Sequence, residues 1–591
     1  MSKFQIALVF FAGTFACCLG DKPSTMRANI SWKEYKLKYL ESDHKVEAHM
    51  AMVELPAIWP GTPQPDSSYL KTKTSTFTVH LRQLKIKDAK VERIVIMLEG
   101  GPGANTNSYE EDFDFAIQLF GKNSLFVLYN HRGVGKSSKV MRSSDTSFVD
   151  IKVLKALIAS TPYPLPAITT INAAHDVAAI ADAMRAQHAS NKVEVIVYGS
   201  SYGTRLAIAA ANVGGKFDLV ILEGIFGNQT FPLSYDTVGK ELLENCMEHA
   251  ECSKRLGPNQ MRLFNLLPEV IKNPGRNECS KYVAEYAKSW GSHRWNIADL
   301  MKMLMRAPPQ VNKMGERGDL RLFLALLLQM ESCSSLIRTK QIVAQLKKTL
   351  EIALKEANGL EAFQEIKELK RTTNKFGFRY IFSSALLGEK VATFCDAKNP
   401  PALMRNTCPS AQDNYEVAEM MKTIMGPAMI GPDQRIKMPI QSNVPILAFQ
   451  GALDFITPLQ HAQWIKTSKG KVYFHVFKNM GHSVINTQTV ECAKEMVDAA
   501  LRGSDTIPSC LSALNSKTLD WDPALEYFPA AGPANPLPNY VPPPTDNESR
   551  TIWSRSNLLK IGLGILLFLG VAVLIFILVR KYRRKEIVVQ V

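Results

Sequence analysis

Two glycines flank a pair of serines in the stretch EVIVYGSSYGTRLAIAAA at residues 194–211. Gly199, Ser201 and Gly203 form the pattern G-x-S-x-G between a predicted strand and a predicted helix. Glycines at these places let strand and helix pack closely, while the serine takes a strained conformation that exposes its hydroxyl. The pattern alone is weak, but its strand-to-helix setting makes Ser201 the candidate nucleophile.

A serine nucleophile needs a general base and an orienting acid, which follow this kind of turn in the order acid, then histidine. Asp454 comes directly after the apolar run VPILAFQGAL. Of the three later histidines, His461 falls in a predicted helix, His475 in a predicted strand and His482 on a loop past the last strand. We therefore expect Asp454 to orient His482, and His482 to take the proton of Ser201.

Attack on a carbonyl group also needs backbone N–H donors for the oxyanion. The run MLEGGPGAN follows the strand predicted at residues 92–98 and places three glycines beside the serine turn. Because proline has no N–H, we expect the donors to be Gly101 and Tyr202, the residue after the nucleophile. A plain glycine turn at residues 100–103 is the alternative.

These residues together resemble the prolyl iminopeptidase and tripeptidyl aminopeptidase family of α/β-hydrolase serine peptidases, over about residues 50–512. The motifs that carry the resemblance are GGPG at 100–103, HRGVGKS at 131–137, GSSYG at 199–203, GALDFITP at 451–458, GH at 481–482 and the cysteines at 492 and 510. The resemblance implies the triad Ser201, Asp454 and His482, a helical cap over the active site, and neither cofactor nor metal.

Members of that family remove residues or short peptides from free N-termini, which implies peptide substrates. The chain departs from the family pattern at Glu99, where members often have histidine, and at Asn130-His131, where they often have Asp-Gln. An exopeptidase needs carboxylates for the substrate ammonium group. Glu223 is a candidate, with a structural role at the cap hinge as the alternative. A carboxylesterase or lipase, and a catalytically silent adhesion or receptor ectodomain, are the competing hypotheses.

The elements that must position these residues alternate along the chain. Short β-rich runs occur at residues 75–81, 92–98, 124–130, 193–199, 217–224, 444–451 and 472–477. Several are apolar almost throughout, as strands covered on both faces require, and helical patterns lie between them. This alternation predicts a doubly wound, mostly parallel sheet, the α/β-hydrolase fold. We assign residues 21–224 and 441–514 to this core, and 225–440 to an inserted α-helical cap.

Two long apolar segments predict export and membrane anchoring. Residues 1–20 have the pattern of a cleaved signal peptide, and residues 558–579 are long enough to span a bilayer. The tail at 580–591 begins with a basic cluster, which marks the cytoplasmic side. We expect a single-pass type I membrane protein whose catalytic domain lies outside the cell or in the secretory or endolysosomal lumen. The Pro-rich residues 515–557 predict a semi-rigid stalk.

The cysteines and sequons fit the same compartment. Eight cysteines follow the signal peptide, an even number that indicates disulfides, and their spacing does not argue for zinc. Proximity favours the pairs Cys492–Cys510 and Cys395–Cys408, although spacing cannot decide among the possible connectivities. Glycosylation sequons occur at Asn29, Asn228 and Asn547.

The net charge of +15 is spread thinly along the chain. The basic tail contributes about +4 of it, and the exported part has no basic run interleaved with aromatic residues. We therefore do not expect nucleic acid as a partner. The expected partners are peptide substrates and the lipid bilayer, whose anionic headgroups the tail can contact.

Overall fold

The computed structural model describes residues 28–62, 73–138, 162–226, 234–289, 320–346 and 439–530, apart from short internal gaps. The strands in these ranges form one sheet in the order β1-β2-β3-β5-β4-β6-β7-β8-β9. They are β1 (Lys33–Glu34), β2 (Val46–Pro56), β3 (Thr76–Ile86), β4 (Arg93–Leu98), β5 (Ser124–Tyr129), β6 (Glu194–Ser200), β7 (Leu219–Glu223), β8 (Ile446–Gly451) and β9 (Val472–Phe477). Neighbours pair antiparallel from β1 as far as β5 and parallel from there to β9.

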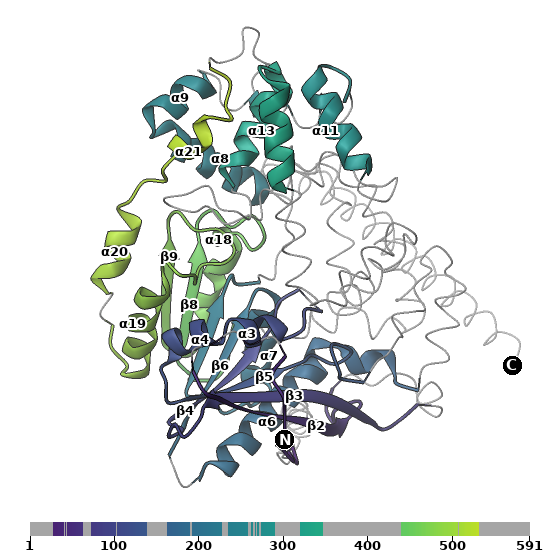
Figure 1. Ribbon diagram of the computed structural model, residues 1–591. Helices are drawn as coiled ribbons and strands as arrows, with labels where there is room; N and C mark the ends of the chain where they lie inside the picture. The colour runs from purple at the N-terminus through teal and green to yellow at the C-terminus, as the bar shows by residue number, and fades with distance from the viewer. Residues whose placement is uncertain are drawn as a thin grey trace, which may run out of the picture. The chain divides into compact units, whose positions relative to one another are not determined.

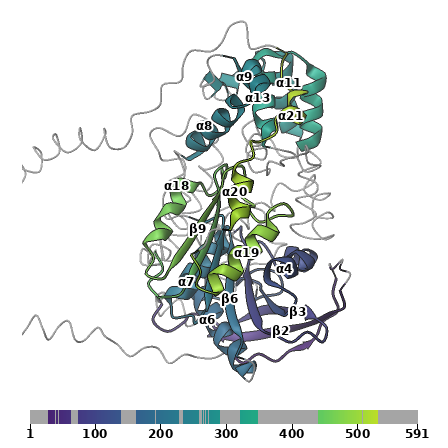
Figure 2. The same ribbon diagram turned by 90° about the vertical axis from the view of Figure 1, so that its left-hand side faces the viewer.

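Helices cover both faces of this sheet (Figure 1). The α-helices are α3 (Asn107–Glu111), α4 (Phe113–Phe120), α6 (Thr170–Gln187), α7 (Tyr202–Asn212), α8 (Ser234–Met247), α9 (Ala250–Leu256), α11 (Glu278–Ser289), α13 (Arg321–Ser332), α18 (Leu459–Ala462), α19 (Val490–Leu501), α20 (Ser509–Asn515) and α21 (Asp522–Leu525). Two 3-10 helices, η2 (Leu165–Ile168) and η8 (Gln463–Thr467), complete the described elements. Figure 2 shows α6 and α7 on one side of the strands and α4 and α19 on the other.

Strand β4 shows why the central strands are apolar almost throughout. Ile94, Ile96 and Leu98 join the apolar core that includes α6 and α7. Val95 and Met97, which alternate with them, join the core that includes α4 and α19. Both sets are buried because successive side chains of a strand point to opposite faces. The observed sheet confirms the predicted α/β-hydrolase architecture.

The carboxyl ends of β4, β6, β7 and β8 meet at one edge of the sheet. The register pairs Leu98 with Gly199, Ser200 with Glu223, and Glu223 with Phe449. Residues that directly follow these strands are therefore neighbours in space, although they lie hundreds of positions apart in the sequence. Active sites of open α/β sheets form at this edge.

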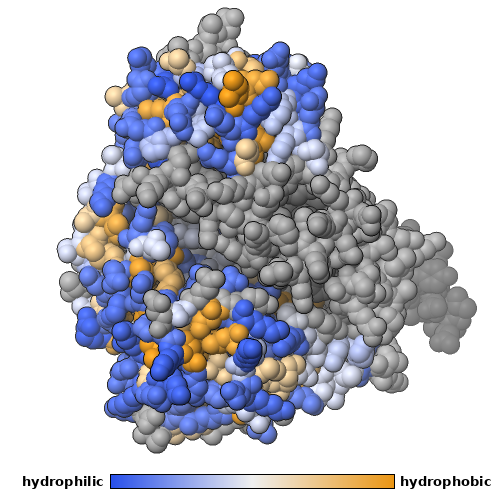
Figure 3. All heavy atoms as spheres, in the orientation of Figure 1, coloured by the Kyte–Doolittle hydropathy of each residue, from blue (hydrophilic) through white to orange (hydrophobic). Residues whose placement is uncertain are grey.

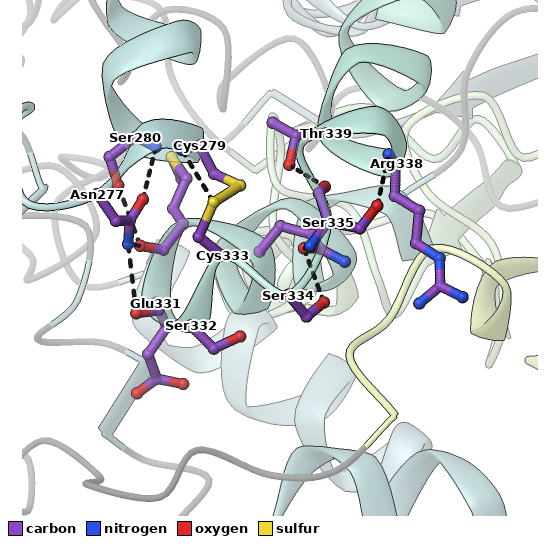
Figure 4. Close-up of a disulfide and its surroundings, with 12 residues drawn as sticks. Asn277, Cys279, Ser280, Glu331, Ser332, Cys333, Ser334, Ser335, Arg338 and Thr339 are labelled. Carbon is purple, nitrogen blue, oxygen red and sulfur yellow. Dashed lines mark hydrogen bonds between the residues drawn. A yellow bond between two sulfur atoms is a disulfide. The ribbon is translucent and has the colours of Figure 1, made fainter.

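The chain leaves the sheet after β7 and returns at β8, and the elements described between them are helices. A disulfide between Cys246 and Cys252 links α8 to α9. A second, between Cys279 and Cys333, links α11 to the residue after α13 (Figure 4). Beside it, Asn277 Nδ2 donates a hydrogen bond of 2.7 Å to the carbonyl of Met330. These links hold α8 to α9 and α11 to α13.

The segment after α20 packs against the cap helices. Trp521 is fully buried, and its Nε1 donates to Asn245 Oδ1 at 3.0 Å. Gln329 of α13 donates to the carbonyl of Tyr527 at 2.7 Å, and Arg338 donates to that of Phe528 at 3.0 Å. These contacts lie within the first part of the range assigned to the stalk. The packed part of the chain therefore extends to about residue 530.

The remaining sequence expectations concern disulfides, glycosylation sequons and membrane segments. Cys492 and Cys510 form a disulfide between α19 and α20. The signal peptide, the segment 558–579, the basic tail, Cys395, Cys408, Asn228 and Asn547 lie outside the described residues. Asn29 is described and exposed. Within the described ranges, no helix is long and apolar enough to cross a bilayer.

Hydrophilic residues cover most of the described surface on the face shown in Figure 3. Large apolar side chains that are well exposed are Met52, Met247 and Ile337 in the described ranges. They come from β2, from the end of α8 and from the segment after α13. Isolated exposed apolar side chains of this kind need no partner to explain them.

Candidate active site

The serine turn has the geometry of a nucleophile elbow. Ser201 has φ 54° and ψ −120°, a left-handed conformation that non-glycine residues rarely adopt. A Cβ on Gly199 would lie 2.3 Å from the carbonyl oxygen of Gly203, and a Cβ on Gly203 would lie 2.2 Å from that of Leu98. Neither position can carry a side chain, so β4, β6 and α7 approach closely and Ser201 stands at the corner.

The predicted acid and base are joined directly. His482 Nδ1 lies 2.9 Å from Asp454 Oδ2 and 3.2 Å from Oδ1. Asp454 is fully buried and accepts hydrogen bonds from the N–H groups of Ile456 and Thr457, both at 2.8 Å. The Thr457 hydroxyl and Gln450 Nε2 also donate to Oδ2, at 2.6 and 3.1 Å. A proton on Nδ1 makes Nε2 the acceptor of the imidazole ring.

Glycines also bring the acid turn and the histidine loop together. A Cβ on Gly451, which ends β8, would lie 2.2 Å from the carbonyl oxygen of Gly481 and 2.3 Å from that of Met480. The loop that carries His482 can therefore pass directly over the end of β8. Asp454, three residues further on, then reaches the imidazole.

The serine and the histidine share neighbours at the end of β7. The N–H of Ser201 donates to the carbonyl of Glu223 at 2.8 Å. Gly224 follows, and a Cβ there would lie 3.0 Å from His482 Cε1. The Ser201 hydroxyl makes no hydrogen bond within the described part of the chain. Catalytic hydrogen bonds are often long or poorly aligned until substrate binds.

The glycine run after β4 passes beside the nucleophile. A Cβ on Gly100 would lie 2.9 Å from Ser201 Cβ and 3.4 Å from its Oγ. Gly101 and Gly103 have φ values of 110° and 102°, where a side chain would be strained. The loop therefore borders Ser201 with backbone alone. The N–H groups of Gly101 and Tyr202 stay the predicted oxyanion donors.

Glu99, one of the two departures from the family pattern, begins this glycine run. Its carboxylate accepts a hydrogen bond of 3.1 Å from the N–H of Gly100 and another from the Ser108 hydroxyl. Burial raises the pKa of Glu99 to about 7, and the charges of Asp112 and Glu223 act in the same direction. Near neutral pH this carboxyl group therefore changes charge beside the oxyanion loop.

Asn130, the second departure, ties that loop to the sheet. Its Oδ1 accepts hydrogen bonds of 3.1 Å from both the N–H and the hydroxyl of Thr106. Its Nδ2 contacts His80 Nδ1 at 2.8 Å. Asn130 thus aims an oxygen acceptor at the segment after the glycine run, and its amide reaches β3.

His131 supports Tyr202. Its Nδ1 lies 3.0 Å from the carbonyl of Arg132, which can only accept, so Nδ1 carries the proton and Nε2 accepts from the Tyr202 hydroxyl at 3.3 Å. Burial lowers the pKa of His131 to about 4, so this ring is neutral at physiological pH. Tyr202 also contacts the Thr170 hydroxyl at 2.8 Å. The ring of a predicted oxyanion residue is therefore held from two sides.

A buried ion pair that the sequence reasoning missed explains the arginine of the HRGVGKS motif. The Arg132 guanidinium donates to both carboxylate oxygens of Asp176 at 2.6 Å, and to the carbonyls of Pro56, Ala57 and Ala167. Asp176 also accepts from Trp59 Nε1 at 2.7 Å. Neither ionic side chain is exposed. Arg132 therefore ties this motif to β2, η2 and α6.

The structure places Glu223 beneath the site. Its Oε1 accepts hydrogen bonds from the N–H groups of Val484 and Ile485, and its Oε2 accepts one from the Tyr198 hydroxyl. Burial raises the pKa of Glu223, and those hydrogen bonds and the charge of His482 act in the opposite direction.

Thr457 is a second site residue that the sequence analysis did not identify. It lies three residues after Asp454, where a threonine can donate a hydrogen bond back to a turn-forming aspartate.

The described residues hold no group of three or more histidine, cysteine, aspartate or glutamate side chains that could bind a metal ion. The candidate site is built from groups that acid–base and nucleophilic chemistry use: a serine on a strained turn, a histidine, a buried carboxylate and a glycine loop.

No protein-family model matches the chain, and no curated protein matches it. Among solved structures, it is similar to an esterase from Exiguobacterium antarcticum, at 12% identity and a TM-score of 0.30, over 73% of this chain and 97% of that one. Acetyl xylan esterase 1 from Thermoanaerobacterium sp. JW/SL YS485 gives 11% identity, a TM-score of 0.32, and coverage of 81% and 89%. A peroxisomal α/β-hydrolase from Saccharomyces cerevisiae gives 12% identity and a TM-score of 0.31, over 88% of this chain and 98% of that one.

These likenesses are distant. The α/β-hydrolase fold of this chain is seen directly in its strand order, in the parallel strands from β5 to β9 and in the serine turn between β6 and α7.

Proposed function

We propose that the chain is a serine hydrolase that works through an acyl-enzyme. The observation that carries this proposal is the strained turn at Ser201, bordered by Gly100 on one side and, across Gly224, by the hydrogen-bonded pair His482 and Asp454. A serine on such a turn has its hydroxyl presented to a substrate carbonyl, and the pair supplies the base that the hydroxyl needs.

The proposed reaction follows from these positions. Ser201 Oγ attacks the substrate carbonyl while its proton passes to His482 Nε2, and Asp454 stabilises the imidazolium through Nδ1. The N–H groups of Gly101 and Tyr202 donate hydrogen bonds to the developing oxyanion. The imidazolium then protonates the leaving group, and a water molecule activated by His482 releases the acyl product from Ser201.

More specifically, we propose a serine aminopeptidase of the prolyl or tripeptidyl type. Support comes from the sequence resemblance, whose motifs fall at the glycine loop, the elbow, the acid turn and the histidine loop. We further propose that the chain is membrane-anchored, with this domain outside the cytosol. The three disulfides of the described residues and the exposed Asn29 sequon support an oxidising compartment.

Matched peptides with free or acetylated N-termini test this proposal. The purified full-length protein and its Ser201→Ala variant would be assayed on chromogenic peptides of both kinds and on p-nitrophenyl acetate. Of the two peptide sets, we expect only the free-amine peptides to be cleaved. The Ser201→Ala variant should turn over no substrate. Cleavage of blocked peptides would favour an endopeptidase, and turnover of the ester alone would favour an esterase. Activity that survives Ser201→Ala would contradict the proposed chemistry.

A further inference from the structure

Glu223 is a buried carboxylate with partners on both oxygens. It ends β7 and is only 4% exposed. Oε1 accepts two backbone hydrogen bonds of 2.8 Å, from Val484 and Ile485. Oε2 accepts a hydrogen bond from the hydroxyl of Tyr198, which is buried on β6. A carboxylate has about four acceptor sites, so three of them are occupied inside the protein.

The two backbone donors belong to the histidine loop. Val484 and Ile485 follow His482 by two and three positions, and both are buried. A single oxygen that accepts two successive N–H groups fixes the direction of the backbone there. The loop leaves β9 after Phe477 and is thereby held against the end of β7, where a Cβ on Gly224 would lie 3.0 Å from His482 Cε1.

The main chain around Glu223 reaches the other two predicted catalytic segments. The carbonyl of Glu223 accepts the N–H of Ser201 at 2.8 Å. The N–H of Gly224 donates to the carbonyl of Phe449 at 3.1 Å, in the strand that leads to Asp454. Glu223 and Gly224 together thus bind the nucleophile turn, the strand of the acid and the loop of the base.

We propose that Glu223 is a positioning residue. Its carboxylate holds the His482 loop and its backbone carbonyl holds the Ser201 turn, so that the two segments keep their relative positions. This inference rests on the proposed hydrolase function. It replaces the sequence-based hypothesis that Glu223 binds the substrate ammonium group. A misplacement of about 1 Å in a catalytic group can cost about 10²-fold in rate, so this clamp matters for turnover although it touches no substrate.

The experiment compares Glu223→Ala, Glu223→Gln and Glu223→Asp in the full-length chain. Glutamine keeps an oxygen for Val484 and Ile485, and its amide can donate to Tyr198. Aspartate keeps the charge but is one methylene too short to reach the loop. Glu331→Ala is the matched control, since Glu331 is a similarly buried carboxylate that binds Arg262 in the cap.

Two readouts separate positioning from other roles. Hydrogen exchange with mass spectrometry reports protection of the amides at residues 483–486, and hydrolysis of p-nitrophenyl acetate reports kcat and KM. In Glu223→Ala and Glu223→Asp we expect amide exchange about tenfold faster. We expect kcat to fall about 10²-fold with little change in KM. Glu223→Gln should restore both values to within about threefold, and Glu331→Ala should leave both unchanged.

Three outcomes would overturn the proposal. The first is unchanged exchange at residues 483–486 in both Glu223→Ala and Glu223→Asp. The second is a loss of amide protection in Glu223→Gln as large as in Glu223→Ala. The third is an unchanged kcat on the ester with a loss only on free-amine peptides, because the acetate ester has no ammonium group. A wild-type protein that turns over no substrate would defeat the proposed function, yet the exchange data would still decide whether the clamp exists.

Discussion

The two sides of the candidate site are built in opposite ways. On the acid–base side, Asp454 accepts hydrogen bonds from two backbone N–H groups, a hydroxyl, an amide and His482. On the oxyanion side, Gly100, Gly199 and Gly203 leave no room for a Cβ. The first side is positioned by these convergent donors together with the close packing at Gly451, and the second mainly by the absence of side chains. We therefore expect the first to be sensitive to a change of hydrogen-bonding group and the second to a change of volume.

Glu99 breaks this division. It is a carboxylate on the oxyanion side, and it accepts hydrogen bonds only from Gly100 and Ser108 within the described residues. Its carboxyl group has a pKa raised to about 7 by burial. Asp454, a fully buried acid after β8, is thus surrounded by donors, whereas Glu99, a partly buried acid after β4, has few.

The largest effect should come from the acid–base side. Asp454→Asn keeps the shape of the side chain but offers an N–H where an acceptor is needed, so His482 is driven to the wrong tautomer. We expect kcat to fall roughly 10⁴-fold on ester and peptide substrates alike. Asp505→Asn, at a largely exposed aspartate, is the control and should leave kcat unchanged. A loss of less than tenfold in Asp454→Asn would show that this carboxylate does not orient the base.

Added volume should break the oxyanion side. In Gly203→Ala the new Cβ would lie 2.2 Å from the carbonyl oxygen of Leu98, which is backbone and cannot move away cheaply. We expect kcat/KM to fall about 10²-fold because the elbow shifts. Stability should also fall, by roughly 1–3 kcal/mol in denaturant unfolding.

Gly275→Ala is the matched control for this substitution, since the nearest atom to its Cβ would be 3.9 Å away. It should leave kcat/KM unchanged. If Gly203→Ala behaves like Gly275→Ala, close packing does not position this side of the site.

The smallest effect concerns Glu99 and pH. Its pKa in the folded chain is about 7, above the ordinary value of 4.5, so the folded state binds the proton more tightly than the unfolded state. The resulting stabilisation is fully present below about pH 4.5 and is lost as the pH rises through about 7. Glu99→Gln cannot titrate and should lack this dependence.

Denaturant unfolding of both proteins between about pH 4 and pH 8 checks this expectation. We expect the stability of the wild type, relative to Glu99→Gln, to fall by about 1–3 kcal/mol across that range. Parallel curves for the two proteins would show that Glu99 does not titrate in this window.

The sequence predicted the sheet and the candidate residues at its edge because both give local signals. Uniformly apolar strands and the G-x-S-x-G turn are visible in short stretches, and chain order then selects Asp454 and His482. His461 in α18 and His475 in β9 lie in the elements expected for them, which was the reason to set them aside.

The supporting contacts could not be predicted because they join distant segments. Glu223 meets the histidine loop 261 residues later, and Arg132 meets Asp176 across 44 residues. Nothing near Glu223 in the sequence distinguishes a carboxylate that binds backbone N–H groups from one that awaits an ammonium group. The docking of residues 517–530 on the cap was hidden for a similar reason, because a Pro-rich composition begins only shortly afterwards.

Labelling with a fluorophosphonate tests the central claim most directly. An activated serine displaces fluoride from this reagent and keeps the phosphonyl group, so fragment mass spectra can distinguish Ser201 from Ser200. We expect one adduct, on Ser201, that is absent in Ser201→Ala and slowed at least about 10²-fold in His482→Ala. An adduct on another residue, or labelling of Ser201 at an unchanged rate without His482, would contradict the account.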